Sequence, residues 1–218
     1  MLKFRLVDTW AVVVARTGLN AKTRLAQVMP RPRDRAELAR AMLADVLAAC
    51  AAAGLSGTLV VTDTGAGWST AWNWGARPLL DPQRGLNAAV SSGLAEAAAR
   101  GARTALVLPG DVPFVRPSDL QALLAAAGDQ ERALVVVPDH SGDGTNALVT
   151  RPPDLVRPAF GAGSAAAHLA QLAGAVRYDC PALALDIDTP AELARLIEVN
   201  STSATATRRL LDRRLRQD

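Results

Sequence analysis

Cysteine, aromatic residues and long apolar runs are all scarce in this chain. The 218 residues include two cysteines, Cys50 and Cys180, which lack the close spacing of a metal site. We therefore expect two free thiols in a reducing compartment, the cytoplasm. No apolar run approaches the roughly 20 residues that span a bilayer. The first ten residues, MLKFRLVDTW, are too short and too interrupted for a signal peptide.

A strong excess of one charge is also missing. The formal net charge is +3 and only 4% of the residues are aromatic, so we expect no nucleic-acid partner, which would need a larger basic patch with interleaved aromatics. The basic stretch TRRLLDRRLRQD (207–218) is predicted to be a solvated helix after a Ser/Thr-rich linker, NSTSATAT (200–207). The chain is thus predicted to hold one domain, 1–199, and a basic C-terminal tail, 200–218. Deletion of residues 203–218 is predicted to spare activity.

Two common nucleotide-binding motifs are absent. The chain has no GxxxxGK[ST] phosphate-binding loop and no GxGxxG dinucleotide fingerprint. Histidine is sparse as well, and both His140 and His168 are expected to be structural rather than catalytic.

Short apolar runs alternate with segments of helical periodicity. The expected strands are 10–15, 57–62, 104–109, 133–138, 145–150 and 182–187. The expected helices are 33–54, 85–101, 116–128, 163–174 and 189–199. This alternation predicts an α/β fold with three layers, in which a mostly parallel sheet carries helices on both faces. Ligands of such folds bind beyond the carboxyl ends of the strands, so polar residues at those ends are the site candidates.

A cationic loop follows the first strand. The segment ARTGLNAKTRLA (15–26) offers Arg16, Lys22 and Arg24, with Gly18 as its flexible point. Several cations and free amides after a strand suit a polyphosphate. A plain basic surface loop is the alternative for this segment taken alone.

Acidic residues follow two further strands. Asp111 stands in PGDVP directly after the strand 104–109, and LDIDTP places Asp186 and Asp188 one residue apart. Alternate residues of an extended segment share a face, and carboxylates held together bind Mg²⁺ while leaving positions for phosphates. Helix capping by Thr189 and Pro190 explains part of LDIDTP but not its two acids.

Two helix starts complete the set of candidates. Asn87, in the first turn after DPQRG, has an amide that can read the edge of a base. The segment GAGS (161–164) opens another helix with free N–H groups, which suits an anion. An ordinary helix start is the alternative for Asn87.

These motifs, in this order, resemble the MobA-like nucleotidyltransferases and, within them, the CofC guanylyltransferases of coenzyme F-420 biosynthesis. The resemblance covers residues 10–198. It is carried by AKTRLA (21–26), GLN (85–87), PGDVP (109–113), GDGTNAL (142–148), FGAGSAAAH (160–168) and LDIDTPAEL (185–193).

The resemblance implies that GTP donates GMP to a small phosphorylated three-carbon acid while pyrophosphate leaves. The acceptor would be phosphoenolpyruvate, 2-phospho-L-lactate or 3-phospho-D-glycerate, and the alanine- and arginine-rich composition hints at the first of these. The resemblance implies that the nucleotide is bound by Arg16, Lys22, Arg24, Asn87, Pro109 and Gly110, with Lys22 and Arg24 at the triphosphate and Asn87 near guanine. It implies that Mg²⁺ is held by Asp111 and Asp188, with Asp186 a lesser candidate. The acceptor would be bound by Thr145, Gly161, Gly163 and Ser164. Lys22, Asp111 and Asp188 are the implied catalytic residues.

One departure and several alternatives remain at this point. The first cation of the loop is Arg16 where the family is expected to have lysine, which puts that contact in doubt but not the reaction. A molybdopterin or isoprenoid-precursor nucleotidyltransferase would share the fold, but many of these have a glycine-rich first loop and this chain has only Gly18 there. A sugar-phosphate enzyme would need a larger acceptor site, and a silent nucleotide-binding protein would not need Lys22, Asp111 and Asp188. A homodimer and a downstream transferase that takes the product are the other expected partners.

Overall fold

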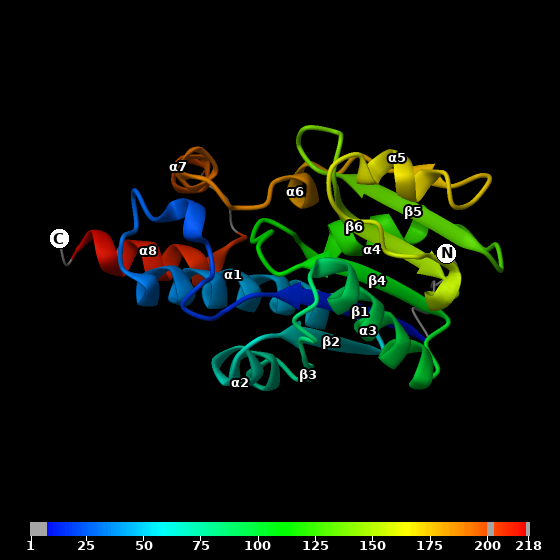
Figure 1. Ribbon diagram of the computed structural model, residues 1–218, viewed down its shortest axis with the longest axis horizontal. Helices are drawn as coiled ribbons and strands as arrows, with labels where there is room; N and C mark the ends of the chain where they lie inside the picture. Colours follow the sequence, from blue (N-terminus) through cyan, green and yellow to red (C-terminus); the bar gives the residue numbers. More distant parts are fainter. Residues whose placement is uncertain (1–7, 200–202, 217–218) are drawn as a thin grey trace.

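The computed structural model describes residues 8–199 and 203–216, in which a seven-stranded sheet is covered by helices (Figure 1). The strands are β1 (Thr9–Ala15), β2 (Gly57–Thr62), β3 (Arg77–Leu80), β4 (Thr104–Pro109), β5 (Ala133–Pro138), β6 (Thr145–Arg151) and β7 (Val176–Arg177). The helices are α1 (Pro32–Ala53), α2 (Gly65–Asn73), α3 (Leu86–Ala99), α4 (Pro117–Ala125), α5 (Ser164–Leu169), α6 (Pro181–Ala184), α7 (Pro190–Glu198) and α8 (Thr205–Leu215), with 3-10 turns η1 (Thr23–Leu25) and η2 (Pro153–Leu155). None of the described helices is long and apolar enough to cross a bilayer.

The strand order is β3-β2-β1-β4-β6-β5-β7. Pairs among β1 to β4 are parallel, β6 runs antiparallel to both β4 and β5, and β7 is parallel to β5. The predicted mostly parallel sheet is therefore confirmed. The antiparallel β6 follows from its short connection to β5, because a tight hairpin can join only antiparallel strands.

Alternating residues of each central strand face opposite layers. In β1, Val13 packs on the side of α1 and α4 whereas Val12 packs on the side of α3. Gly93 of α3 lies directly over Val12, and a Cβ at Gly93 would collide with that side chain. Close approach of α3 to β1 therefore requires glycine at this position, and the expected three-layer arrangement is confirmed.

The strand expected at 182–187 is not a strand. Pro181 begins the short helix α6, and residues 185–188 form an extended segment outside the sheet. The backbone N–H of Ile187 donates to the carbonyl of Asp111 (3.0 Å), and β7 takes the place beside β5. Proline at the first turn favours a helix start, and the apolar residues of ALALDI are buried in local clusters rather than in a ladder.

The expectation that the C-terminal helix is solvated is also wrong. Helix α8 packs along α1 at one end of the molecule (Figure 1), and Leu210 and Leu211 are buried there. Residues 205–207 belong to α8 rather than to a linker, and residues 200–202 lie outside the described residues. Whether residues 1–199 fold as a unit without the tail stays a prediction.

Both cysteines are free thiols, as expected, and both are buried. Burial raises the pKa of the Cys50 thiol to about 12.

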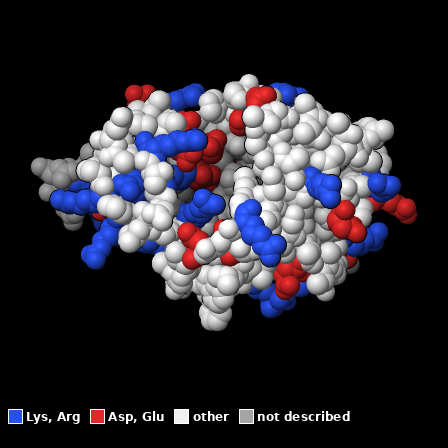
Figure 2. Space-filling model, in the orientation of Figure 1, with Lys and Arg blue, Asp and Glu red and all other residues white. Residues whose placement is uncertain are grey.

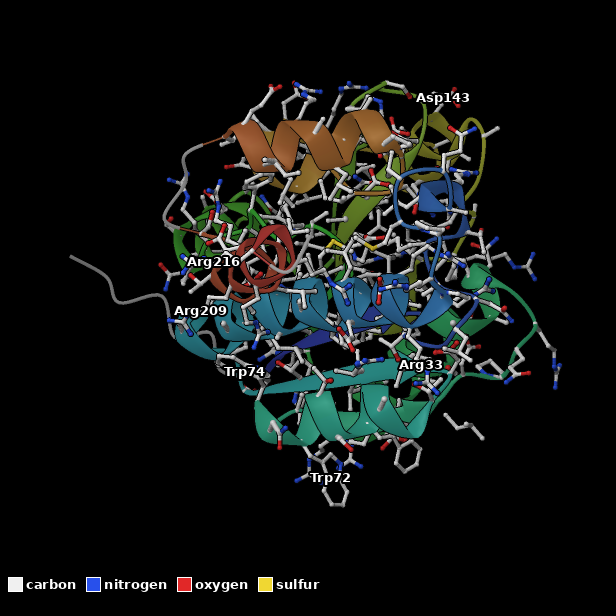
Figure 3. All side chains as sticks on the ribbon, turned by 90° about the vertical axis from the view of Figure 1, so that its left-hand side faces the viewer. Arg33, Trp72, Trp74, Asp143, Arg209 and Arg216 are labelled. Atoms are coloured by element: carbon white, nitrogen blue, oxygen red, sulfur yellow. The ribbon has the colours of Figure 1, made fainter. Side chains whose placement is uncertain are left out.

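Not every large apolar side chain is buried. Figure 3 shows Trp72 pointing away from α2 into solvent, and 69% of that residue is exposed.

Candidate active site

A cleft of about 480 Å³ opens at the carboxyl ends of β1 and β4, the place that the sheet topology predicts for a ligand. Figure 2 shows a hollow on one face of the molecule, with acidic side chains in its wall and basic side chains around it. The cleft contains nine of the predicted site residues, namely Arg16, Lys22, Arg24, Pro109, Gly110, Asp111, Thr145, Asp186 and Asp188.

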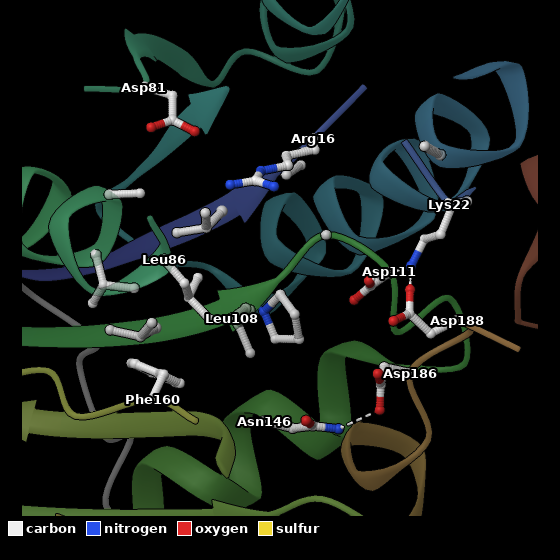
Figure 4. Close-up of a pocket in the computed structure, with 18 of the residues that line it drawn as sticks. Arg16, Lys22, Asp81, Leu86, Leu108, Asp111, Asn146, Phe160, Asp186 and Asp188 are labelled. Carbon is white, nitrogen blue, oxygen red and sulfur yellow. Dashed lines mark hydrogen bonds and ion pairs between the residues drawn. The ribbon is translucent and has the colours of Figure 1, made fainter. Parts of the chain in front are cut away.

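The ammonium of Lys22 lies between two carboxylates (Figure 4). Its Nζ donates to Asp111 Oδ2 at 2.5 Å and to Asp188 Oδ1 at 2.9 Å. Arg24 Nη1 donates to the second oxygen of Asp188 at 3.1 Å. Three segments far apart in the sequence therefore meet through one cation.

The backbone explains why these three segments meet. Gly110 donates its N–H to the carbonyl of Val14, and a Cβ at Gly110 would come within 2.6 Å of the Ala15 Cβ, so the end of β4 lies tightly against β1. Lys22 has a left-handed backbone (φ 52°) at the start of η1. A non-glycine residue in this region is uncommon, and such strain concentrates at functional positions.

Electrostatic interactions keep Lys22 and Asp188 ionised. Burial opposes the charge of Lys22, but the carboxylates of Asp111 and Asp188 outweigh it, and the net effect raises the pKa of Lys22. Burial also acts to raise the pKa of Asp188, but the ammonium of Lys22 and the guanidinium of Arg24 hold it below its usual value. Lys22 and Asp188 therefore form a salt bridge between charged groups near neutral pH.

Asp186 has a different environment. Burial, and next the nearby charge of Asp111, raise the pKa of Asp186. Asn146 Nδ2 donates to Asp186 Oδ1 (3.1 Å) and also to the carbonyls of Leu183 and Ala184. Asp186 and Asp188 both face the cleft while Ile187 between them is buried on the other side, as expected for an extended segment.

The residues present fit a divalent metal. Asp111 Oδ1 is buried and has no hydrogen-bond partner within the described residues. Asp111, Asp186 and Asp188 all line the cleft, so their carboxylate oxygens are available on one wall. No group of three or more His, Cys, Asp or Glu in the described part of the chain is arranged to hold a metal by itself. Mg²⁺ commonly uses one or two carboxylates together with substrate phosphates, so Asp111 and Asp188 are a sufficient protein contribution.

Four predicted residues do not line the cleft. The side-chain amide of Asn87 is exposed and pairs with the backbone of Phe160, to which it donates and from which it accepts a hydrogen bond. Gly163 donates its N–H to Asp143 (2.8 Å), and the Ser164 hydroxyl is buried and finds no hydrogen-bond partner among the described residues. Gly161 is also absent from the cleft wall, although it directly follows Phe160, which forms part of that wall. Their predicted roles stay predictions.

Other lining residues were not assigned a role from the sequence. Asp81, Asn146 and Phe160 all contribute to the cleft. Asn146 and Phe160 stand inside the motifs GDGTNAL and FGAGSAAAH, and Asp81 directly precedes the turn before α3. Their positions at strand ends and turns were the available signal, but the facing of each side chain depends on tertiary packing.

Comparison with known proteins places this chain in a family. Residues 10–216 match the family model described as guanylyl transferase CofC like. The chain is 40% identical over 219 residues to the phosphoenolpyruvate guanylyltransferase of Conexibacter woesei, covering 96% of this chain and 98% of that protein. It is 41% identical to the protein of the same name from Rubrobacter xylanophilus, covering 87% and 94%.

A solved structure shows the same fold. The putative nucleotide-diphospho-sugar transferase from Desulfovibrio desulfuricans aligns with a TM-score of 0.71 at 17% identity, covering 96% of this chain and 97% of that one. The family match and the two relatives go further than fold and agree with the motifs that meet around Lys22. The chain belongs to the CofC-like guanylyl transferase family.

Proposed function

We propose that the protein transfers GMP from GTP to phosphoenolpyruvate, with release of pyrophosphate, in the biosynthesis of coenzyme F-420. The observation that carries the proposal is the contact of Lys22 with both Asp111 and Asp188 at the carboxyl end of the sheet. Phosphoenolpyruvate is preferred over 2-phospho-L-lactate and 3-phospho-D-glycerate because the relatives from Conexibacter woesei and Rubrobacter xylanophilus are named for it.

The reaction forms one bond and breaks one bond at phosphorus. An oxygen of the acceptor phosphate attacks the α-phosphorus of GTP, and the bond from that phosphorus to the β-phosphate oxygen breaks as pyrophosphate leaves. The acceptor phosphate is already ionised near neutral pH, so no strong general base is needed. Within the described cleft wall there is no histidine, which agrees with this requirement.

The chain's own residues position charge. Lys22, Arg24 and Arg16 line the cleft and would bind the triphosphate, which offsets the repulsion between donor and acceptor phosphates. Asp111 and Asp188 would hold Mg²⁺, with Asp186 beside them, and the metal would supply charge stabilisation of the phosphates. Thr145, at the start of β6, would contact the acceptor from the opposite wall.

The charged side chains of the cleft argue against a catalytically silent protein. A silent nucleotide-binding protein would not need an orphaned carboxylate oxygen on Asp111 beside a buried lysine.

The test is pyrophosphate release from GTP and Mg²⁺ with each of the three phospho-acids, combined with the mass of the product. We expect the fastest release with phosphoenolpyruvate, and much slower release when ATP or CTP replaces GTP. Release with a different acceptor would change the substrate only. No release with any acceptor would favour the silent protein. Homodimerisation and transfer of the product to a downstream transferase are further parts of the proposal.

A further inference from the structure

The buried ring of His168 connects two parts of the cleft wall. His168 lies in α5 and has no exposed surface. Its Nδ1 is 3.0 Å from the hydroxyl of Thr145, and its Nε2 accepts a hydrogen bond from the backbone N–H of Ala159 (2.9 Å). The ring also stacks edge to face on Phe160, with centroids 4.9 Å apart.

These contacts determine which nitrogen of His168 carries the proton. A backbone N–H can only donate, so Nε2 must present its lone pair to Ala159. Burial lowers the pKa of His168, so the ring is neutral near pH 7 and has one N–H, which must then be on Nδ1. The Nδ1–H therefore faces the oxygen of Thr145 and donates to it. The ring also hydrogen-bonds the backbone of Ser164, which acts to raise the pKa of His168 but does not outweigh burial.

The direction of this hydrogen bond decides what Thr145 can do. A hydroxyl has one hydrogen to donate, and Thr145 Oγ1 cannot give it to a nitrogen that is already protonated. Thr145 lines the cleft, and His168 is the side chain to which its hydroxyl bonds within the described residues. Its hydrogen is thus left for a group in the cleft.

We propose that His168 is a positioning residue that orients the Thr145 hydroxyl as a hydrogen-bond donor to an anionic oxygen of the acceptor. The proposal rests on the proposed function, because it assigns the acceptor to this wall. A carboxylate or phosphate oxygen can only accept hydrogen bonds, so a hydroxyl held as a donor selects such a group over a neutral hydroxyl. His168 acts here without contact to substrate and without titrating.

The first test is independent of activity. Nitrogen-15 chemical shifts and long-range proton couplings of the imidazole report the tautomer, and the chain has only two histidines, His168 and the exposed His140. We expect the Nδ1–H tautomer for His168, and substitution His140→Gln assigns the signals. An Nε2–H tautomer or a protonated ring at pH 7.5 would overturn the inference and leave the proposed function intact.

The second test is a double-mutant cycle on the Michaelis constants for acceptor and GTP. His168→Gln keeps an acceptor near Ala159 but withdraws the donor from Thr145, and Thr145→Val removes the hydroxyl while retaining its shape. Each is expected to raise the acceptor KM by about tenfold or more, as for a lost hydrogen bond to a charged group, with the GTP KM unchanged. The double variant should be no worse than Thr145→Val, because both act through one hydroxyl.

A purely structural role of His168 gives a different pattern. If His168 served only to hold Ala159, His168→Gln would leave the acceptor KM unchanged. In that case His168→Ala would also raise the acceptor KM by the same factor in the wild-type and in the Thr145→Val background. Thr145→Ser gives a second measure should the His168 variants unfold, as judged by thermal melts. Because serine keeps the hydroxyl, its acceptor KM is expected to lie well below that of Thr145→Val, and a KM equal to that of Thr145→Val would overturn the role of the hydroxyl. A wild type that responds to no acceptor, with the Nδ1–H tautomer confirmed, would instead refute the proposed function.

Discussion

The carboxylate of Asp45, in the middle of α1, caps the first turn of α8. It accepts hydrogen bonds from the backbone N–H of Ala206 (2.7 Å), from the backbone N–H of Thr207 (2.9 Å) and from the Thr207 hydroxyl (2.6 Å). The residue in the N-cap position, Ala204, has no side chain that can do this. Asp45 therefore satisfies free N–H groups of a helix whose Ala206 lies 161 residues further along the chain.

This contact changes the expectation for the C-terminal tail. Leu210 and Leu211 of α8 share an apolar cluster with Leu25, Phe114 and Ile187, which adjoin the segments that carry Lys22, Asp111 and Asp188. Deletion of residues 203–218 is thus expected to lower both the melting temperature and activity, rather than to spare activity as the composition of the tail alone suggests.

A milder change tests the same point. Thr207→Val is expected to lower the free energy of unfolding by about 1–3 kcal/mol, because the buried Asp45 loses a donor. Urea unfolding measures the change, and Arg216→Ala, at the exposed end of α8, is the control that should leave it unaltered. A truncated protein with full activity and stability would show that the cluster does not support the site.

Lys22 and Arg24 bind the same carboxylate but differ in burial. The Lys22 side chain is 7% exposed and that of Arg24 is 74% exposed. Lys22→Met is expected to destabilise the fold by about 1–3 kcal/mol, less than a fully buried pair because its partners are partly solvated, and Arg24→Met by less than about 1 kcal/mol. Lys22→Met should also raise the KM for GTP more steeply. Equal effects of both variants on stability and KM would contradict the assignment of Lys22 to the triphosphate.

Substitution of Asp111 or Asp188 is expected to change how turnover depends on the Mg²⁺ concentration. Asp111→Asn and Asp188→Asn are expected to abolish most turnover and to shift the Mg²⁺ requirement upwards while the circular dichroism spectrum is retained, because these groups serve the site rather than the core. Asp186→Asn should have a smaller effect, since Asn146 already holds Asp186. Asp212→Asn, on the exposed face of α8, is the matched control. Normal turnover at limiting Mg²⁺ in the Asp111 or Asp188 variant would remove that residue from the metal site.

The lowered pKa of His168 leads us to expect that the stability of the fold depends on pH. Burial holds its pKa in the folded protein below the usual 6.5, so below that pH the unfolded chain binds a proton that the folded chain does not. The stability from the neutral ring is therefore fully present above pH 6.5 and is lost as the pH falls towards the lowered pKa. The difference in unfolding free energy between the wild type and His168→Asn should shrink between pH 7.5 and pH 5, as measured by urea titrations. A difference independent of pH would show that the pKa of His168 is not lowered.

Substitution of Asn87 distinguishes a role in supporting Phe160 from a role in binding guanine. Its amide holds both backbone groups of Phe160, and it is predicted to lie near guanine. Because the amide is engaged with Phe160, we expect Asn87→Ala to loosen that wall and raise the acceptor KM by about tenfold, the scale of a lost pair of hydrogen bonds. Kinetics with GTP and ITP measure the alternative. A raised KM for GTP with an unchanged acceptor KM would place Asn87 at the base instead.

Local patterns determined most of the regular structure. Runs such as LVVT in β2 and VVVP in β5 are apolar on both faces, which is typical of strands that are covered by helices on both sides. Helix α1 ends at Gly54 in a left-handed conformation, as its sequence indicates. The order of these elements was enough to predict the sheet type and the edge where the cleft would lie. Residue type also predicted Lys22, Asp111 and Asp188, because charged groups at strand ends have few structural uses.

Tertiary contacts decided the remainder. The segment 182–187 is a short apolar run that resembles a buried strand, but the hydrogen bond from Ile187 to Asp111 holds it at the end of β4 and outside the sheet, which no local pattern encodes. The basic residues of 207–218 concealed two leucines that close a cluster, and the cap for that helix comes from Asp45 in α1. The sequence by itself thus determined which residues have suitable chemistry and roughly where each strand ends. Only the folded chain decided which of them touch, because long-range hydrogen bonds and burial depend on partners far away in sequence.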